Sequence, residues 1–359
     1  MAKDEDLTEG ITEAVRDAVE AGTPLCIRGG GTKDFYGRAG SGEPLNTTAH
    51  RGIVNYEPTE LVLTARAGTP LLEIERALAA EGQMLSFEPP HFDGEEAATL
   101  GGAVACGLSG PRRAFGGALR DMVLGTRVIN GRGKVLRFGG EVMKNVAGYD
   151  VSRLMAGALG TLGVILEVSL KVLPRPPAEN SLTLECPPED TFARAEGWLR
   201  QGIPVSGTFH DGQHLHVRLS GTESAVESGT RAVGGERVDD APAFWRRVRD
   251  QQLPFFDTES GPPLWRIALP PGSELPAIEG PCALEWAGKL AWVRSGASPG
   301  DIRHEAERLG GHATLFRGGD REGDIFHPLS KTVAALHERL KASFDPDGIF
   351  NPGRLYNGL

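Results

Sequence analysis

Three glycine-rich segments in the first half of the chain constrain its fold more than any other feature. They are residues 27–33 (IRGGGTK), residues 98–125, which contain ATLGGA and LSGPRR, and residues 160–165 (GTLGVI). Glycine lets main-chain N–H groups come close to a ligand, and successive N–H groups form a concave anion-binding site. Three such segments in one half of a protein predict a large phosphate-containing ligand such as a dinucleotide.

The two common phosphate-binding motifs are absent from the sequence. G-x-G-x-x-G, the dinucleotide fingerprint, does not occur, and neither does the P-loop pattern G-x-x-x-x-G-K-[ST]. Three further glycines, at 37, 40 and 42, follow the first segment, so a helix is not expected directly after it. We therefore expect the phosphates to lie on loop N–H groups rather than at a helix terminus.

Composition excludes several classes of protein. A chain of 359 residues has room for two or three domains, and its net charge of −10 argues against a nucleic-acid partner. No apolar run approaches the roughly 20 residues of a membrane span, and the polar N-terminus does not read as a signal peptide. The four cysteines are far apart without a C-x-x-C pair, which excludes a zinc ribbon or a self-contained iron–sulfur motif. We expect a cytoplasmic protein.

Hydrophobic periodicity predicts an α+β chain in two parts. In the first part we expect helices at 7–21, 70–78 and 151–158 and strands at 25–27, 60–67, 123–129, 134–138 and 164–172. The run Pro174-Arg175-Pro176-Pro177 is the clearest boundary signal. Beyond it we expect helices near 190–201, 241–252, 301–309 and 329–343, and strands near 215–220, 264–269 and 289–294. All five tryptophans lie in this second part, where we expect them in the core or at a subunit interface: Trp198, Trp245, Trp265, Trp286 and Trp292.

In their order along the chain, the motifs resemble those of the vanillyl-alcohol-oxidase/PCMH flavoprotein superfamily. They are R-G-G-G-T, A-T-x-G-G, R-D-x-V-L-G, K-N-x-x-G-Y-D, G-T-L-G-V-I and the closing F-D-P-x-G-I-F-N-P-G. Within that superfamily the chain is most similar to the FAD-binding E subunits of bacterial glycolate oxidase, over nearly its whole length. The resemblance implies a PCMH-type FAD-binding domain of two α+β subdomains, at 1–58 and 59–175. It also implies an α+β cap or substrate domain at 176–320 and a C-terminal helix and tail, 321–359, that return to the FAD domain.

The same resemblance implies which residues hold FAD. The first glycine segment would bind the pyrophosphate through backbone N–H groups, the second would line the ribityl chain and flavin, and the third would contact the adenosine half. A loop at 88–90 would lie along the cofactor, and two cations, Lys144 and Arg113, would lie nearest the anion of the reduced flavin. The implied residues are Arg28, Gly29, Gly30, Gly31, Thr32, Lys33, Pro89, Pro90, Thr99, Gly101, Gly102, Ser109, Gly110, Arg113, Lys144, Gly160, Thr161, Gly163, Val164, Ile165 and Asn351.

Two departures from the pattern matter. Relatives that bind flavin covalently carry a histidine after the first glycines, where this chain has Thr32, so we expect non-covalent FAD. Catalytic D-type relatives carry a histidine-rich metal site with a Glu-His partner. His210, His214 and His216 are the best metal candidates here, but the partner is missing downstream, so no metal is expected.

The sequence identifies candidate substrate-binding and catalytic residues less specifically than it identifies the cofactor-binding residues. Arg266 and Arg317 could each place a guanidinium on a substrate carboxylate, and His327 could serve as the base. Each of the three could equally be a structural residue, with the arginines in salt bridges.

Three functions are compatible with these features. The first is the FAD subunit of a glycolate oxidase complex, which takes part in the oxidation of glycolate to glyoxylate with a D-type FAD subunit and an iron–sulfur subunit as partners. Any membrane contact would then be peripheral and made through the complex. The second is a self-sufficient FAD-dependent oxidoreductase of another small hydroxy acid or alcohol. The third is a non-catalytic assembly subunit.

Overall fold

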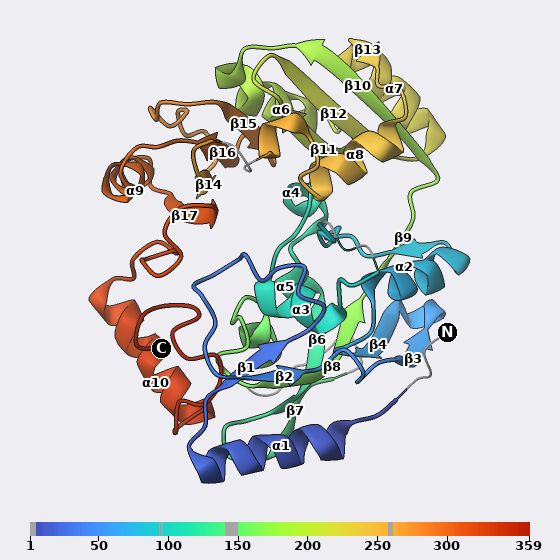
Figure 1. The fold of residues 1–359 in the computed structure, drawn as a ribbon. Coiled ribbons are helices and arrows are strands. Elements are labelled where there is room, and N and C mark those ends of the chain that lie inside the picture. The colour runs from blue at the N-terminus through green and yellow to red at the C-terminus, as the bar shows by residue number, and fades with distance from the viewer. Residues whose placement is uncertain (1–4, 93, 95, 141–149, 258–260) are drawn as a thin grey trace.

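The protein has a mixed α/β fold, in which two lobes pack against each other (Figure 1). The computed structural model describes residues 5–92, 94, 96–140, 150–257 and 261–359. Lys144 and most of the K-N-x-x-G-Y-D motif lie outside these residues. Among the described residues, no helix is both long enough and apolar enough to cross a membrane.

The first lobe is built on a five-stranded antiparallel sheet in the order β3-β4-β8-β6-β7. Its strands are β3 (Ile53–Glu57), β4 (Val62–Arg66), β6 (Val123–Ile129), β7 (Val135–Gly139) and β8 (Val164–Lys171). Two strands form a separate parallel pair, β1 (Leu25–Arg28) and β2 (Glu43–Asn46), and β5 (Gln83–Met84) pairs with β9 (Leu173–Pro174).

Helices cover this lobe with the apolar faces that the sequence predicts. α1 (Thr8–Ala21) buries Ile11 and Val15 and ends at Gly22, which has a left-handed φ of 62°. α2 (Leu71–Ala80) and α3 (Leu100–Cys106) bury leucines and a valine in one core with the sheet. Two short helices complete the lobe, α4 (Arg113–Gly116) and α5 (Leu119–Met122).

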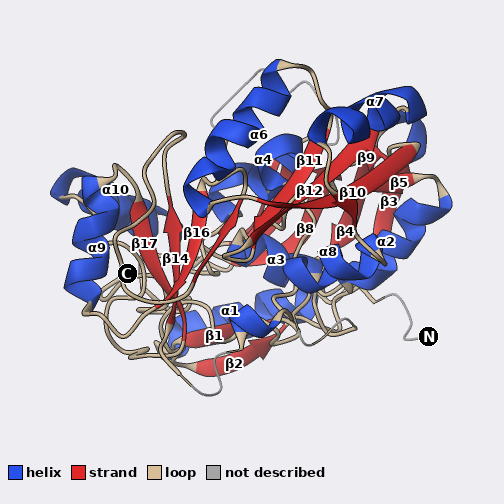
Figure 2. Ribbon diagram, turned by 90° about the horizontal axis from the view of Figure 1, so that it is seen from above, coloured by secondary structure: helices blue, strands red, loops and turns tan. Residues whose placement is uncertain are grey.

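The second lobe is an eight-stranded antiparallel sheet in the order β13-β10-β12-β11-β15-β16-β14-β17. Its strands are β10 (Ala178–Glu185), β11 (Val205–His210), β12 (His214–Gly221), β13 (Glu236–Arg237), β14 (Leu264–Ala268), β15 (Cys282–Glu285), β16 (Leu290–Arg294) and β17 (His312–Arg317). Its helices are α6 (Thr191–Arg200), α7 (Glu223–Val233), α8 (Ala241–Arg249) and α9 (Pro299–Arg308). α6 and α7 cover one face of β10–β12, as Figure 2 shows from above, and α8 packs on the face toward the first lobe.

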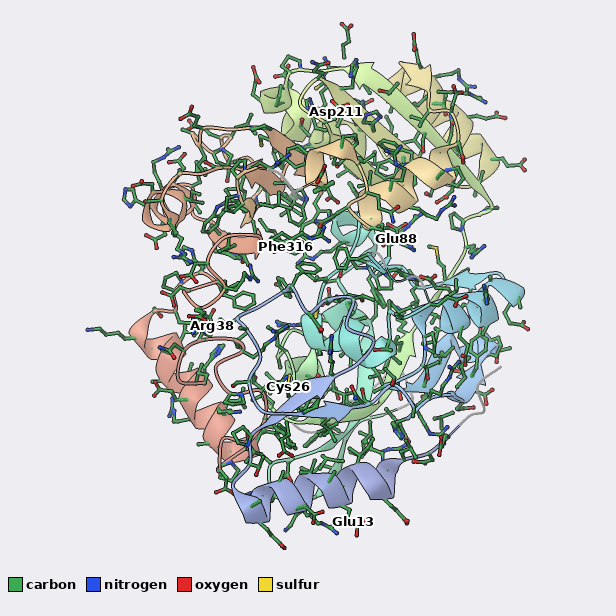
Figure 3. The ribbon with its side chains drawn as sticks, in the orientation of Figure 1. Glu13, Cys26, Arg38, Glu88, Asp211 and Phe316 are labelled. Carbon is green, nitrogen blue, oxygen red and sulfur yellow. The ribbon has the colours of Figure 1, made fainter. Side chains whose placement is uncertain are left out.

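An apolar layer joins the two lobes. Tyr36, Phe92 and Leu108 from the first lobe share one buried cluster with Phe316, Trp292 and other residues of the second. A buried ion-pair network lies beside this layer: the Glu88 carboxylate pairs with Arg112 at 3.5 Å and with Arg218 of β12 at 2.8 Å. Figure 3 shows Glu88 and Phe316 between the two lobes. These contacts hold the sheet of the second lobe over the first lobe.

The C-terminal segment returns to the first lobe, as expected. α10 (Lys331–Phe344) precedes a tail in which Lys341 Nζ donates to the carbonyls of Thr161 and Phe350, each at 2.8 Å. Asn351 accepts a hydrogen bond from Ile27 N at 2.7 Å and donates Nδ2 to the Leu159 carbonyl at 2.6 Å. One side chain therefore ties β1, the third glycine segment and the tail together.

Two predicted elements need correction. The helix expected over 151–158 is only one 3-10 turn, Ser152–Met155, because Gly157, Leu159 and Gly160 all adopt positive φ and no helix can continue through them. The helix expected to reach residue 252 ends at Arg249, and Gln251 has a φ of 55°. Several elements were not expected from the sequence: strands β2, β3, β5, β9, β10, β11, β13, β15 and β17 and helices α3, α4, α5 and α7.

We predict that Asn351→Asp lowers the free energy of unfolding by roughly 2–3 kcal/mol, because a buried carboxylate cannot donate to the Leu159 carbonyl. Chemical denaturation measures the difference. Asn357→Asp, an exposed position in the same tail, is the control and should stay within about 0.5 kcal/mol of the parent. Equal stability of the two variants would contradict the structural role given to Asn351.

Candidate functional site

A cavity of about 400 Å³ lies where the three glycine segments meet. The end of β1, the loop after it, the helix α3 and the turn before β8 form its walls, and Asn351 and Arg354 close it from the tail. Bare backbone therefore forms much of the wall. The predicted cofactor residues that line it are Arg28, Gly29, Gly30, Gly31, Thr32, Lys33, Thr99, Gly101, Gly102, Gly160, Gly163, Ile165 and Asn351.

The first two glycine segments pack directly on one another. A Cβ atom at Gly30 would lie 1.6 Å from the carbonyl oxygen of Ala97, and one at Gly29 would lie 2.6 Å from Thr99 Oγ1. A side chain at Gly30 would require a shift of the backbone, and one at Gly29 would displace the Thr99 side chain. The glycines thus have a packing role as well as exposing N–H groups to the cavity.

A buried lysine supplies positive charge to this cavity. Lys33 is 7% exposed and its Nζ donates to Thr32 Oγ1 at 3.2 Å. Within the described part of the chain, no carboxylate lies within ion-pair distance of Nζ, and burial lowers the pKa of the ammonium group. The charge of Asp250 acts on Lys33 only from beyond ion-pair distance. A buried ammonium without a contacting carboxylate is costly, so this position fits an anionic ligand group.

A second, much smaller cavity lies beside the first. It measures about 20 Å³ and is lined by Pro90, Phe92 and the loop 108–110 from the first lobe, and by residues of α8 and strands β14–β17 from the second. Lys33 of the large cavity lies 5.4 Å from the centre of the Phe92 ring, which lines the small one. The two cavities are therefore neighbours along α3 and the loop that follows it.

Two ionisable side chains line the small cavity. Glu285, at the end of β15, is 4% exposed, and its Oε1 accepts a hydrogen bond from Trp292 Nε1 at 2.7 Å. Burial raises the pKa of this carboxyl to about 7. Arg266 of β14 lines the same cavity, and burial lowers the pKa of its guanidinium. Among the described residues, the Arg266 guanidinium forms neither a hydrogen bond nor an ion pair.

The turn after Glu285 holds this arrangement against the first lobe. Trp286 and Ala287 both have positive φ, 57° and 59°, which is unfavourable for residues other than glycine. Trp286 Nε1 donates to the Gly110 carbonyl at 3.1 Å, and Ala287 N donates to Thr208 Oγ1 at 2.7 Å. Two guanidinium groups also lie over the Trp286 ring, those of Arg113 at 4.4 Å and Arg266 at 5.1 Å.

Some of the predicted site residues lie at or near the small cavity instead of the large one. Pro90, Ser109, Gly110 and Arg266 line the small cavity rather than the large one. Arg113 stacks on Trp286, and Arg317 stacks on Phe35 and Phe92 at 4.3 and 5.0 Å, one layer behind the cavity.

The remaining predicted residues lie elsewhere. Pro89, Thr161 and Val164 line neither cavity, and Thr161 Oγ1 donates to the Ala158 carbonyl. His327 lies away from both cavities, with Nε2 at 3.2 Å from Glu307 Oε1.

The three histidines considered as metal ligands have other partners. His210 is fully buried between the Cys186 carbonyl and Gly212 N, at 2.8 and 3.0 Å. His214 and His216 lie beside the Asp211 carboxylate. In the part of the chain that the structure describes, no group of three His, Cys, Asp or Glu side chains could hold a metal ion.

Sequence reasoning missed Glu285 and the role of Trp286. Glu285 directly follows the short apolar stretch Cys282–Leu284. An acidic residue at the end of an apolar strand is the one local signal that could have identified it. Its cavity partners come from β14, α8 and the loop at 108–110, so no sequence spacing identifies them. Trp286 was expected only as a core or interface residue.

Known proteins resemble this chain in sequence and in fold. A family model described as an FAD binding domain matches residues 7–139. The glycolate oxidase subunit GlcE of Escherichia coli is 49% identical over 359 residues, with 100% of both chains covered. The glycolate oxidase subunit GlcD of Bacillus subtilis is 31% identical, with 97% of this chain and 87% of GlcD covered.

A solved structure of p-cresol methylhydroxylase with substrate bound superposes with a TM-score of 0.72, at 15% identity, covering 98% of this chain and 87% of that one. At that identity the match shows the fold. Together the comparisons confirm the PCMH-type α+β fold, FAD as the cofactor and an FAD-dependent oxidoreductase. The large cavity fits this cofactor, because its bare glycine walls admit close approach and Lys33 offers a buried positive charge to an anion.

We predict that Lys33→Met weakens FAD binding at least tenfold, about 1.4 kcal/mol, because the cavity loses its buried cation. Titration of the FAD-free protein, followed by flavin fluorescence, measures the dissociation constant. Lys134→Met removes an exposed lysine and serves as the control. An unchanged dissociation constant for Lys33→Met would place the cofactor anion elsewhere.

A second prediction concerns the pH dependence of stability in the FAD-free protein. The folded state raises the pKa of Glu285 from 4.5 to about 7, so its stabilising contribution is complete below pH 4.5 and is lost as pH rises through 7. A shift of that size corresponds to roughly 3 kcal/mol. Glu285→Gln should therefore lose less stability than the parent between about pH 5 and 8. Glu167→Gln, which replaces a buried carboxyl paired with Arg127 in the other lobe, should keep the parental slope.

Proposed function

The chain belongs to the family of FAD-binding E subunits of bacterial glycolate oxidase, within the vanillyl-alcohol-oxidase/PCMH flavoproteins, and from this membership we propose that it is the FAD-carrying subunit of a glycolate-oxidising complex. The observation that carries the proposal is the 49% identity to GlcE over the whole of both chains. The proposed reaction is the oxidation of glycolate to glyoxylate. The proposed partners are a D-type flavoprotein subunit, similar to GlcD, and an iron–sulfur subunit that receives the electrons.

In this proposal the first lobe binds the cofactor. Gly29 to Gly31 offer backbone N–H groups to the pyrophosphate, Lys33 offsets its charge, and the turn at 160–165 receives the adenosine half. The segment from Thr99 to Gly110 lies along the ribityl chain and flavin, which places the flavin end beside the small cavity. Bound FAD accepts the electron pair removed from the hydroxy acid and passes it on.

We also propose the domain boundaries that the sequence suggested. Residues 1–175 would form the FAD-binding domain, with subdomains 1–58 and 59–175, residues 176–320 the cap, and residues 321–359 a tail that closes the cofactor cavity. Contacts of Asn351 and Lys341 with the first lobe support the last of these.

One observation favours a carrier role within the complex over independent oxidation of the acid. The small cavity at the expected flavin end measures about 20 Å³, close to the space of one water molecule, and aromatic side chains of both lobes surround it. A hydroxy acid does not fit there in this conformation. A partner subunit would then oxidise the acid and reduce this flavin.

We predict that the chain, expressed with its partner genes, copurifies with a second flavoprotein and an iron–sulfur protein. Anaerobic mixing with glycolate should bleach this subunit's flavin in the complex, and mixing with the purified chain alone should not. Bleaching of the isolated chain would establish a self-sufficient oxidoreductase instead. A colourless chain that does not take up added FAD would support an assembly subunit and contradict the proposal.

A further inference from the structure

The small cavity contains charged groups that the binding of FAD does not use. Arg266 and Glu285 enter it from neighbouring parts of the cap sheet, while Ser109 and Gly110 enter it from the cofactor side. The cavity therefore joins the expected flavin end of the first lobe to two ionisable groups of the second. The following inference rests on the proposed function, because it requires FAD in the large cavity.

The size of the cavity decides what it can hold. A water molecule needs roughly 10–15 Å³ and two to four polar partners. A cavity of about 20 Å³ with a carboxyl, a guanidinium and the Ser109–Gly110 loop at its wall meets both conditions for one water. The cavity is too small for an organic acid. Its polar groups are therefore available to hold a proton or to stabilise a charge beside the cavity.

Arg266 lacks a fixed counter-charge. Two other charged groups near the cavity have ion-pair partners: Arg249 of α8 pairs with Asp250 at 2.7 Å, and Glu88 pairs with Arg112 and Arg218. Arg113 stacks on the Trp286 ring at 4.4 Å, and its positive charge acts on Arg266. Of the described charged residues, Glu285 is the acid whose charge acts on Arg266, and the pair is not within 4 Å. Such a guanidinium stabilises negative charge that appears nearby.

Glu285 is placed to change its protonation state. Trp292 fixes one oxygen of its carboxyl at 2.7 Å, and the group lines the cavity. Burial favours the protonated form, the Trp292 hydrogen bond and the charge of Arg266 favour the carboxylate, and the charge of Glu88 opposes the carboxylate. Directly after Glu285, the turn at Trp286 and Ala287 has positive φ and is anchored to the Gly110 loop by the Trp286 side chain. Backbone conformations of this kind persist where the surrounding structure enforces them, often at functional sites.

We propose that Glu285 is a proton-holding residue coupled to the redox state of the flavin, and that Arg266 is the fixed cation that stabilises the reduced cofactor. When FAD takes up two electrons and one proton, the negative charge that remains favours the protonated form of Glu285. Where Glu285 is a carboxylate before reduction, its O–H bond forms with a proton from solvent, delivered through the cavity water. The electrons come from the 2-hydroxy acid by way of the partner flavoprotein, and the proton is released when the electrons leave.

The midpoint potential of the flavin, measured against pH in the FAD-loaded full-length chain, tests this coupling. In the parent protein the potential should fall more steeply with pH above about pH 7, where reduction adds a second proton, than below it. Glu285→Gln should show one slope throughout. Arg266→Met should lower the equilibrium constant for reduction at least tenfold at every pH, which is about 30 mV for a two-electron couple.

Glu167→Gln, in the other lobe, is the matched control and should keep the change of slope. If Glu285→Gln does not load FAD, Glu285→Asp retains the carboxyl and should move the change of slope without abolishing it. A single slope in the parent, or a change of slope that survives in Glu285→Gln, would overturn the inference while the proposed function stands. A parent chain that binds no FAD would overturn both.

Discussion

The close contact between the first two glycine segments is the constraint on which the rest of the structure depends. Gly29 and Gly30 lie against Thr99 and Ala97 at distances that no Cβ atom could tolerate. That contact fixes the end of β1 against the start of α3 and forms the floor of the large cavity. Asn351 adds the third segment through its bonds to Ile27 and Leu159. These contacts produce the large cavity, whose walls are backbone from three distant parts of the chain.

The position of the cap follows from a second set of contacts. A buried Glu88 carboxylate between Arg112 and Arg218 is stable only while both lobes are in place, since removing one partner would leave a buried charge. The aromatic layer of Tyr36, Phe92 and Phe316 fills the space beside it. Together these contacts reduce the room beyond the cofactor cavity to about 20 Å³ and bring Arg266 and Glu285 to its edge.

The sequence allowed the cofactor half to be predicted well because its signals are local. Each glycine segment is a continuous run, so its residues could be named before their meeting point was known, and twelve of the named residues line one cavity together with Asn351 of the tail. The helix α1 and its end at Gly22 were likewise predicted from local periodicity and one glycine.

The second lobe was predicted less well, because its site depends on contacts between residues far apart. Trp286 meets Gly110 across 176 residues, and the strained φ of its turn has no sequence signature. Nothing in the local sequence distinguishes Glu285 from other glutamates, because its burial and its cavity partners come from distant parts of the chain. Arg266 was named as a candidate, but the sequence could not separate it from Arg317, which lies one layer behind.

The central claim is that the three glycine segments together hold FAD, and hydrogen–deuterium exchange of the chain with and without saturating FAD tests it most directly. Slower amide exchange is predicted in residues 28–33, 99–106 and 159–165 when FAD is bound, with exchange in α7 and α9 unchanged. Stoichiometric FAD binding without protection of these three segments would contradict the claim.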